Sequence, residues 1–173
     1  MSINKGGQSL KPYVGGKEVK EAYVGSQLVY RSTPPYVYAF LGGQDDYVLA
    51  DWCTLSGAGA AIVKEGNNFR IALSSYEAGR LFRTGSISMT KPTNAGNTLS
   101  FMVKKSTSYG TEMVIYKYLS SGAQTIIRTF TPTTNWQLVS VDVSNVGDAT
   151  IIITAEATNY FDKVYFDAIR FEG

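Results

Sequence analysis

Apolar and polar residues alternate along most of this chain, in short runs rich in Val, Ile, Thr, Tyr and Phe with turn residues between them. A period of two is typical of a β-strand with one buried face, whereas the period of an amphipathic helix is nearly absent. The pattern therefore predicts an all-β protein. Beyond residue 35 it predicts ten short strands, which fit a jelly-roll β-sandwich, at 36–40, 60–65, 69–74, 80–89, 98–104, 111–119, 125–130, 136–143, 150–156 and 163–171.

The last of these segments predicts an irregularity. Val164 and Phe166 have one parity along the strand, but Ile169 and Phe171 have the other. Successive side chains of a strand point to opposite faces, so a regular strand would expose two of these four residues. We therefore expect a β-bulge near residues 167 and 168, since one extra residue would return all four to the core.

The N-terminal segment contains a short repeat with a ten-residue period. Tyr-Val-Gly opens both copies, at residues 13–15 and 23–25. The pairs Gly15-Gly16 and Gly25-Ser26 suit two-residue hairpin turns of the primed types, which need the positive φ that glycine adopts without strain. Two such turns predict a three-stranded β-meander.

The turns also set the register of this meander, which pairs Val14 with Lys17, Pro12 with Val19, Leu10 with Glu21, Tyr23 with Leu28 and Glu21 with Tyr30. One face is then apolar, and we expect it to be an assembly face that comprises Leu10, Pro12, Val14, Val19, Tyr23, Leu28 and Tyr30. A sheet this small is marginal unless that face is covered. It either packs on its own sandwich, or joins copies of the chain or attaches the chain to a larger particle.

Consecutive prolines at 34 and 35 mark a boundary between the meander and the sandwich. Proline stiffens the chain and cannot donate a strand hydrogen bond. We therefore divide the chain into an N-terminal β-meander for assembly or attachment at 1–33 and a jelly-roll β-sandwich at 36–173.

Composition and charge exclude several classes of partner. The net charge is +2 with scattered basic residues, too few to supply the phosphate contacts of a nucleic-acid-binding protein. No run approaches the roughly 20 apolar residues that cross a bilayer, and the start lacks an apolar signal region. We therefore expect that the chain is made in a cytoplasm and does not insert into a membrane.

Cys53 is the single cysteine and is expected to be a small buried residue. Histidine is absent, which removes Ser-His-Asp and Cys-His catalysis and imidazole metal ligands.

The stretch from residue 66 to 173 resembles the galactose-binding-like jelly rolls that include many carbohydrate-binding modules. The likeness lies in the hairpin at 66–71, the long middle strands, the strand entry at 134–141 and the closing strand at 164–171. The resemblance implies the fold more than a sugar ligand, because such sandwiches also serve as adhesive or structural modules.

The Tyr-Val-Gly repeat resembles the opening segments of many phage-encoded virion proteins. With the sandwich, it makes the chain similar to bacteriophage fibre, tail or capsid-decoration proteins. This resemblance implies a homotrimer, with other virion proteins and a host-surface glycan as partners, located in the virion after synthesis in the host cytoplasm.

Sugar binding needs aromatic faces with polar groups beside them, and three aromatic residues are candidates. Trp52 and Tyr109 lie in segments that are expected to be loops, where each either contacts a ligand or closes one end of the sandwich. Trp136 has the solvent-facing parity of its strand, but the same tryptophan in similar modules commonly packs at the sandwich edge, and we favour that packing.

The jelly-roll resemblance also implies a structural calcium ion. Asp167 is the matching position, and Asp45 and Asp46 are further candidates because calcium prefers six to eight oxygen ligands. The alternative is that Asp167 caps the bulge or faces solvent. No other cofactor is expected.

Catalysis has little support in the sequence. Asp45 and Asp46 are neighbours along the chain and tend to point apart, whereas glycoside hydrolysis needs two carboxyls about 5–9.5 Å apart across a cleft. We expect a non-enzymatic virion structural protein that assembles through its N-terminus and presents its sandwich for host-surface or glycan binding. A bacterial carbohydrate-binding module is the alternative, and a glycoside hydrolase is the second alternative.

Overall fold

The computed structural model describes residues 36–78, 81–106, 112–156 and 163–172, together with six short strands before residue 32. Side chains are described in 36–74, 85–106, 112–155 and 163–172. The internal contacts divide the chain into two compact units, Met1–Pro35 with Gly173 and Tyr36–Glu172. Within the described residues, no helix is long and apolar enough to cross a membrane.

The described strands of the first unit pair as three antiparallel hairpins, β1 (Asn4–Lys5) with β2 (Gln8–Ser9), β3 (Tyr13–Val14) with β4 (Lys17–Glu18), and β5 (Glu21–Val24) with β6 (Gln27–Arg31). The expected pairs Val14–Lys17 and Tyr23–Leu28 are present. The expected pair of Glu21 with Tyr30 is wrong. The register shifts between Ala22 and Tyr23, so that Ala22 faces Tyr30 and Glu21 faces Arg31.

The predicted three-stranded meander differs from these hairpins, because β4 and β5 belong to separate two-stranded sheets. A one-residue register shift exchanges the faces of the residues beyond it, which the alternation pattern cannot anticipate. Leu10, Pro12 and Val19 of the expected assembly face lie outside the described residues, and only the backbone of the other four is described. The assembly face stays a prediction.

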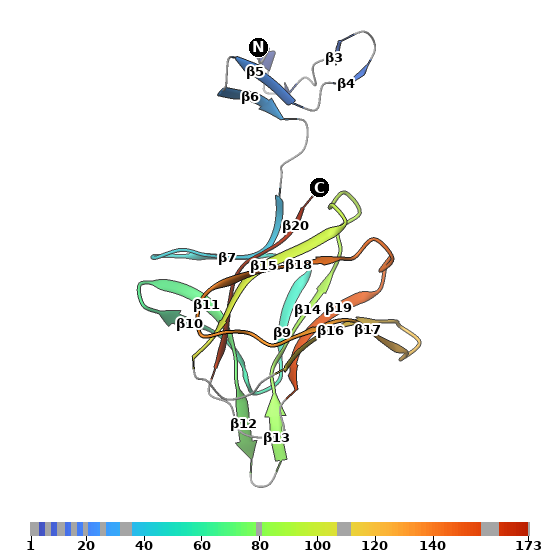
Figure 1. Ribbon diagram of the computed structural model, residues 1–173. Helices are drawn as coiled ribbons and strands as arrows, with labels where there is room; N and C mark the ends of the chain where they lie inside the picture. Colours follow the sequence, from blue (N-terminus) through green and yellow to red (C-terminus); the bar gives the residue numbers. More distant parts are fainter. Residues whose placement is uncertain are drawn as a thin grey trace. The chain divides into compact units, whose positions relative to one another are not determined.

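The second unit is a sandwich of two antiparallel sheets (Figure 1). A seven-stranded sheet contains β7 (Tyr36–Gly42), β8 (Tyr47–Leu49), β10 (Ala60–Glu65), β11 (Asn68–Leu73), β15 (Thr98–Lys105), β18 (Gln137–Asp142) and β20 (Val164–Glu172). A five-stranded sheet has the order β17 (Gln124–Phe130), β16 (Glu112–Tyr118), β19 (Thr150–Glu156), β14 (Ser86–Thr90) and β9 (Cys53–Ser56). A separate hairpin joins β12 (Ser75–Ala78) to β13 (Leu81–Thr84). The all-β prediction is confirmed.

Strand β20 organises the larger sheet. Its first half pairs with β11, its second half pairs with β7, and most of its length pairs with β15. The predicted bulge is confirmed: Met102 of β15 faces Asp167, while Ser100, two residues earlier, faces Arg170. Ala168 at the bulge has a φ of 48°. The four large apolar residues of β20 are consequently all fully buried, namely Val164, Phe166, Ile169 and Phe171.

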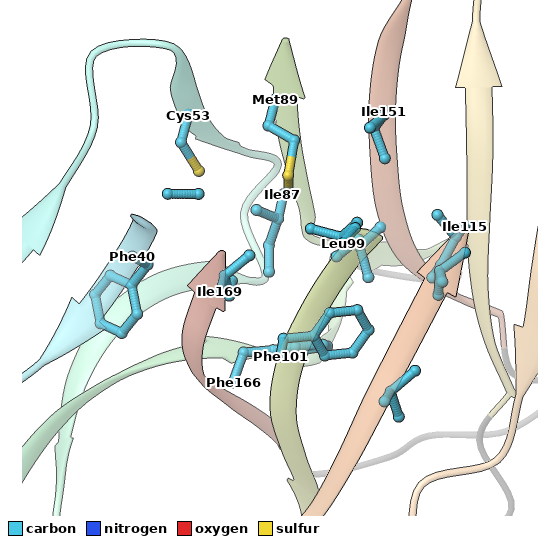
Figure 2. Packing of buried hydrophobic residues seen from close by; sticks show 14 of the residues in the cluster. Phe40, Cys53, Ile87, Met89, Leu99, Phe101, Ile115, Ile151, Phe166 and Ile169 are labelled. Carbon is cyan, nitrogen blue, oxygen red and sulfur yellow. The ribbon is translucent and has the colours of Figure 1, made fainter. Parts of the chain in front are cut away.

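The core lies between the two sheets, and side chains from both fill it (Figure 2). Phe101 is fully buried and packs on Phe166, with ring centroids 5.7 Å apart. Cys53 lies in the same core, as expected, and burial raises the pKa of its thiol to about 11. The thiol is therefore protonated and unreactive near neutral pH.

The strand prediction misses β8, β9 and β12, and joins β13 to β14 as one strand at 80–89. β8 and β9 span three and four residues, too few to show an alternation. Gly85 separates β13 from β14 at a close approach of two backbone segments, where a Cβ atom would lie 2.3 Å from the Ala60 nitrogen. Only the three-dimensional crossing of these segments reveals that requirement.

Candidate functional site

The outer face of the seven-stranded sheet collects aromatic and charged side chains. Because the core takes alternate residues of each strand, the positions between them point away from the core. We call the resulting set the charged-aromatic face, and it comprises Tyr36, Tyr38, Glu65, Arg70, Lys104, Trp136, Tyr165, Asp167, Arg170 and Glu172. It draws on five neighbouring strands and on the residue just before β18.

Arg70 and Asp167 form the innermost ion pair of this face. The Arg70 Nη1 atom lies 2.8 Å from Asp167 Oδ2, and the two side chains are only 11% and 18% exposed. The same Nη1 donates to the Phe69 carbonyl at 2.9 Å. The Trp136 ring covers the guanidinium, with its centroid 5.3 Å from Cζ. The cation is therefore held in one orientation by a carboxylate, a carbonyl and an aromatic ring.

Lys104 and Glu65 form a second pair beside the first. The Lys104 Nζ donates to Glu65 Oε1 at 2.6 Å. It lies 5.1 Å from the centroid of Trp136 and 5.7 Å from that of Tyr165. The Trp136 ring thus contacts two cations from different strands, and each contact contributes about 0.5–2 kcal/mol.

A third pair lies further along β20. Arg170 Nη2 is 2.8 Å from Glu172 Oε1, and Arg170 Nε donates to the same oxygen at 3.0 Å. The Tyr36 ring covers this guanidinium at 4.5 Å, and Tyr38 packs edge-on against Tyr36 at 6.0 Å. Tyr36 remains 40% exposed. An aromatic ring with an ion pair beside it therefore occurs at two places on one face.

The chemistry of this face is that of a binding surface for a flat, hydroxylated ligand. Half-exposed rings offer apolar faces, and the flanking carboxylates and cations offer hydrogen-bond acceptors and donors in fixed positions. Exposed ion pairs contribute only about 0–1 kcal/mol each to folding, and the desolvation of a buried pair such as Arg70–Asp167 offsets most of its attraction, so stability alone does not account for three pairs on one face. Each carboxylate here has a cationic partner, so the face as a whole carries little net charge.

Asp167 does not fit the calcium ligand that the jelly-roll resemblance implies. Its Oδ1 accepts the N–H groups of Gly42 at 3.0 Å and Ala168 at 2.7 Å, while its Oδ2 pairs with Arg70. Both oxygens are engaged, and the guanidinium already supplies a positive charge. Within the ranges that the structure describes, no three acidic or cysteine side chains gather in an arrangement that could hold a metal ion. Asp167 instead caps the bulge, which is the alternative from the sequence.

The three aromatic residues predicted from the sequence lie in different surroundings. Trp52 packs against the core, with its ring 5.8 Å from that of Phe171, as the end-closing alternative requires. Tyr109 lies outside the described residues. Trp136 contacts Arg70 and Lys104 on the outer face and is not among the described side chains that pack on the core. Trp136 therefore points away from the core, as its solvent-facing parity indicates, and does not show the edge packing that the sequence analysis favours.

The sequence interpretation did not identify most of the charged-aromatic face. Tyr165 and Arg170 alternate with the core residues of β20, so the parity of that strand was a usable signal once the bulge was placed. Tyr36 had no such signal, because the partner that gives it a role, Arg170, is far along the chain. Arg70 had no such signal either, and Asp167 was a candidate only as a calcium ligand or as the cap of the bulge, because its pairing with Arg70 joins distant strands.

No family model matches the chain, and no curated protein matches it. Solved structures of family 29 carbohydrate-binding modules share its fold. A variant of CBM29-2 has a TM-score of 0.55 at 16% identity over 79% of this chain and 91% of that chain. A family 29 module gives 0.54 at 16% identity over 79% and 86%, and another CBM29-2 variant, complexed with mannohexaose, gives 0.56 at 15% over 79% and 89%.

At these identities the likeness establishes the fold, a β-sandwich of the carbohydrate-binding-module type. This fold agrees with the jelly-roll resemblance of residues 66–173.

Proposed function

We propose that residues 36–172 form a carbohydrate-binding module, which binds a glycan on the charged-aromatic face without catalysing a reaction. The observation that carries this proposal is the presence of two ring-and-ion-pair clusters on one outer face, around Trp136 and around Tyr36. The shared fold with family 29 modules supports it. CBM29-2 variants are described in complexes with cellulohexaose and with mannohexaose.

The spacing of the clusters favours a chain of several sugars. Tyr165 and Arg170 both belong to β20, and five residues of strand span at most about 16 Å, somewhat less here because the bulge at Ala168 lies between them. A ligand that reached both clusters would therefore be an extended oligosaccharide rather than a single sugar. The paired charges favour an uncharged glycan, because a uronic acid would have to compete with Asp167 or Glu65 for their cations.

Isothermal titration calorimetry with cellohexaose and mannohexaose tests the proposal. We expect Trp136→Ala and Tyr36→Ala each to weaken binding about tenfold or more, because each removes a ring face that stacks on the ligand. Ile126→Ala is the matched control, since Ile126 is 58% exposed but lies on β17 of the other sheet. Affinities for both oligosaccharides that are unchanged in both ring variants would contradict the proposal.

The finer interpretation, a homotrimeric phage virion protein, is a separate proposal that rests on the Tyr-Val-Gly repeat and its expected apolar face. The mass of the protein in solution, measured with and without residues 1–33, tests it. A trimer that becomes a monomer on truncation is the expected result, and a monomer in both cases would contradict it.

A further inference from the structure

A recess lies on the same sandwich, and its lining is separate from the charged-aromatic face. It has a volume of about 330 Å³ and opens between the turn after β16 and the segment that precedes β19. Its main lining residues are Tyr118, Leu119, Ser120, Val146, Asp148 and Ala149. None of them belongs to the charged-aromatic face. The volume is at the small end of the range for ligand pockets, so the recess suits one ring rather than a chain.

Backbone hydrogen bonds hold both walls of this recess in place. In the turn after β16, the Leu119 N–H donates to the Ala123 carbonyl at 3.0 Å, and the Gly122 N–H donates to the Leu119 carbonyl at 2.9 Å. In the opposite wall, the Ala149 N–H donates to the Val146 carbonyl at 3.3 Å. A pocket with walls fixed in this way does not have to be ordered when a ligand binds.

Side-chain contacts fix the segment before β19 as well. Lys117 Nζ donates to the Asn145 carbonyl at 2.5 Å, which ties this segment to the end of β16. The Ser144 N–H donates to Asp142 Oδ1 at 2.8 Å, and the hydrogen bonds from Ser144 hold the pKa of that carboxyl below its usual value. The recess is therefore formed before any ligand arrives.

The surface of the recess combines an apolar floor with polar groups at its rim. Val146 and Ala149 are 2% and 7% exposed and form the floor. Tyr118 supplies an aromatic ring, while Ser120 and Asp148 are exposed. No hydrogen bond or ion pair joins Asp148 to another residue in the part of the chain that the structure describes. Its carboxylate is available to accept hydrogen bonds from a ligand.

We propose that this recess is a second sugar site, which takes a single uncharged pyranose ring such as the end of a glycan chain. This inference rests on the proposed function. The ring of Tyr118 would face the apolar side of the sugar, and Asp148 and Ser120 would bind its hydroxyls. The unpaired carboxylate disfavours uronic acids by charge repulsion.

Two sites on one sandwich have a functional consequence. A module that holds one chain on the charged-aromatic face and the end of another in the recess joins two glycan chains. On a surface that presents many chains, two weak contacts from one protein raise the overall affinity above that of either site.

Two-dimensional ¹H–¹⁵N NMR titration of the full chain with methyl β-D-glucopyranoside and methyl β-D-mannopyranoside tests the inference. We expect the backbone signals of Leu119, Ser120 and Asp148 to shift on addition of at least one sugar, and to shift equally in Trp136→Ala. Asp148→Ala should weaken this effect about tenfold, the change expected when a charged hydrogen-bond acceptor is lost. Asp148 is exposed, so its removal should leave the fold intact. Glu112→Ala, an exposed acid at the other end of β16, is the matched control.

The outcomes separate this inference from the proposed function. If neither sugar shifts the recess signals, or the shifts persist unchanged in Asp148→Ala, the second site is wrong. Hexasaccharide binding that depends on Trp136 would then leave the proposed function standing. If the recess signals shift while the hexasaccharide affinity is unchanged in Trp136→Ala and Tyr36→Ala, the second site stands. The charged-aromatic face is then not the glycan site.

Discussion

The two sheets of this sandwich present very different outer faces, although both obey the same alternation. The seven-stranded sheet exposes aromatic rings and three ion pairs. In the five-stranded sheet, the neighbouring strands β9, β14 and β19 present hydroxyl and aliphatic side chains, namely Thr54, Ser56, Ser86, Ser88, Thr90, Ile152 and Thr154. Neighbouring hydroxyls there bond to one another, as Ser56 and Ser86 do at 2.8 Å.

This comparison shows that a solvent-facing parity does not by itself indicate a binding surface. The hydroxyl groups on these three strands are small, and the bond between Ser56 and Ser86 needs no ligand. On the seven-stranded sheet, long charged side chains are half-buried under rings, which costs side-chain entropy and desolvation. Because these unfavourable terms offset most of the stability that the ion pairs contribute, the outer face of the seven-stranded sheet is the better candidate for a binding surface.

The largest expected effect comes from removing the carboxylate that joins three elements of the charged-aromatic face. Asp167→Ala leaves Arg70 without its anion and the N–H groups of Gly42 and Ala168 without their acceptor. We expect the free energy of unfolding, measured by urea denaturation, to fall by about 2–4 kcal/mol.

The matched changes sharpen this test. Asp167→Asn keeps an oxygen acceptor for the two N–H groups but replaces the oxygen that pairs with Arg70 by an amide NH2, so its loss should be smaller than that of the alanine variant but still measurable. On the other sheet, Ser86→Ala removes a hydroxyl–hydroxyl bond and should cost at most about 1 kcal/mol. Equal losses for Asp167→Ala and Ser86→Ala would remove the energetic distinction between the faces.

A medium effect is expected for Lys104→Ala, which removes the cation between Trp136 and Tyr165. Affinity for cellohexaose or mannohexaose should fall about fivefold to tenfold, since the ring of Trp136 loses a support and Glu65 loses its partner. The free energy of unfolding should fall by about 1–2 kcal/mol, because two cation–π contacts and a partly exposed ion pair are lost. Lys91→Ala, which removes an exposed hydrogen bond to Asn97, is the control and should change neither quantity appreciably.

A small gain in stability is expected at the bulge. Ala168 is the one non-glycine residue with positive φ in the described part of the chain. Glycine adopts this conformation without the steric cost of a Cβ, so Ala168→Gly should raise the free energy of unfolding by about 0.5–1 kcal/mol. A loss of stability in urea denaturation would mean that the bulge is held in some other conformation.

No effect is expected when calcium is added or removed. Because Arg70 already neutralises Asp167, the melting temperature and the glycan affinity should be the same with EDTA as with added calcium. A clear rise in either quantity on addition of calcium would restore the metal site that the jelly-roll resemblance implies. It would also make the charged-aromatic face dependent on an ion.

Much of the fold could be predicted because alternation is a local signal. The strands at 60–65 and 150–156 have the expected bounds, and the bulge in β20 followed from the parity of four apolar residues. Short strands such as β8 could not be found in this way, because three residues carry no period. The division at Gly85 depends on contact with Ala60, which no local pattern records.

The sequence by itself determined the class of fold and the core-facing parity of the long strands, because these depend only on residues a few positions apart. The tertiary structure alone decided that Arg70 pairs with Asp167 and that Tyr36 covers Arg170. These partners meet because β20 lies between β11, β15 and β7, and strand order is set by the packing of the whole sheet rather than by any one segment.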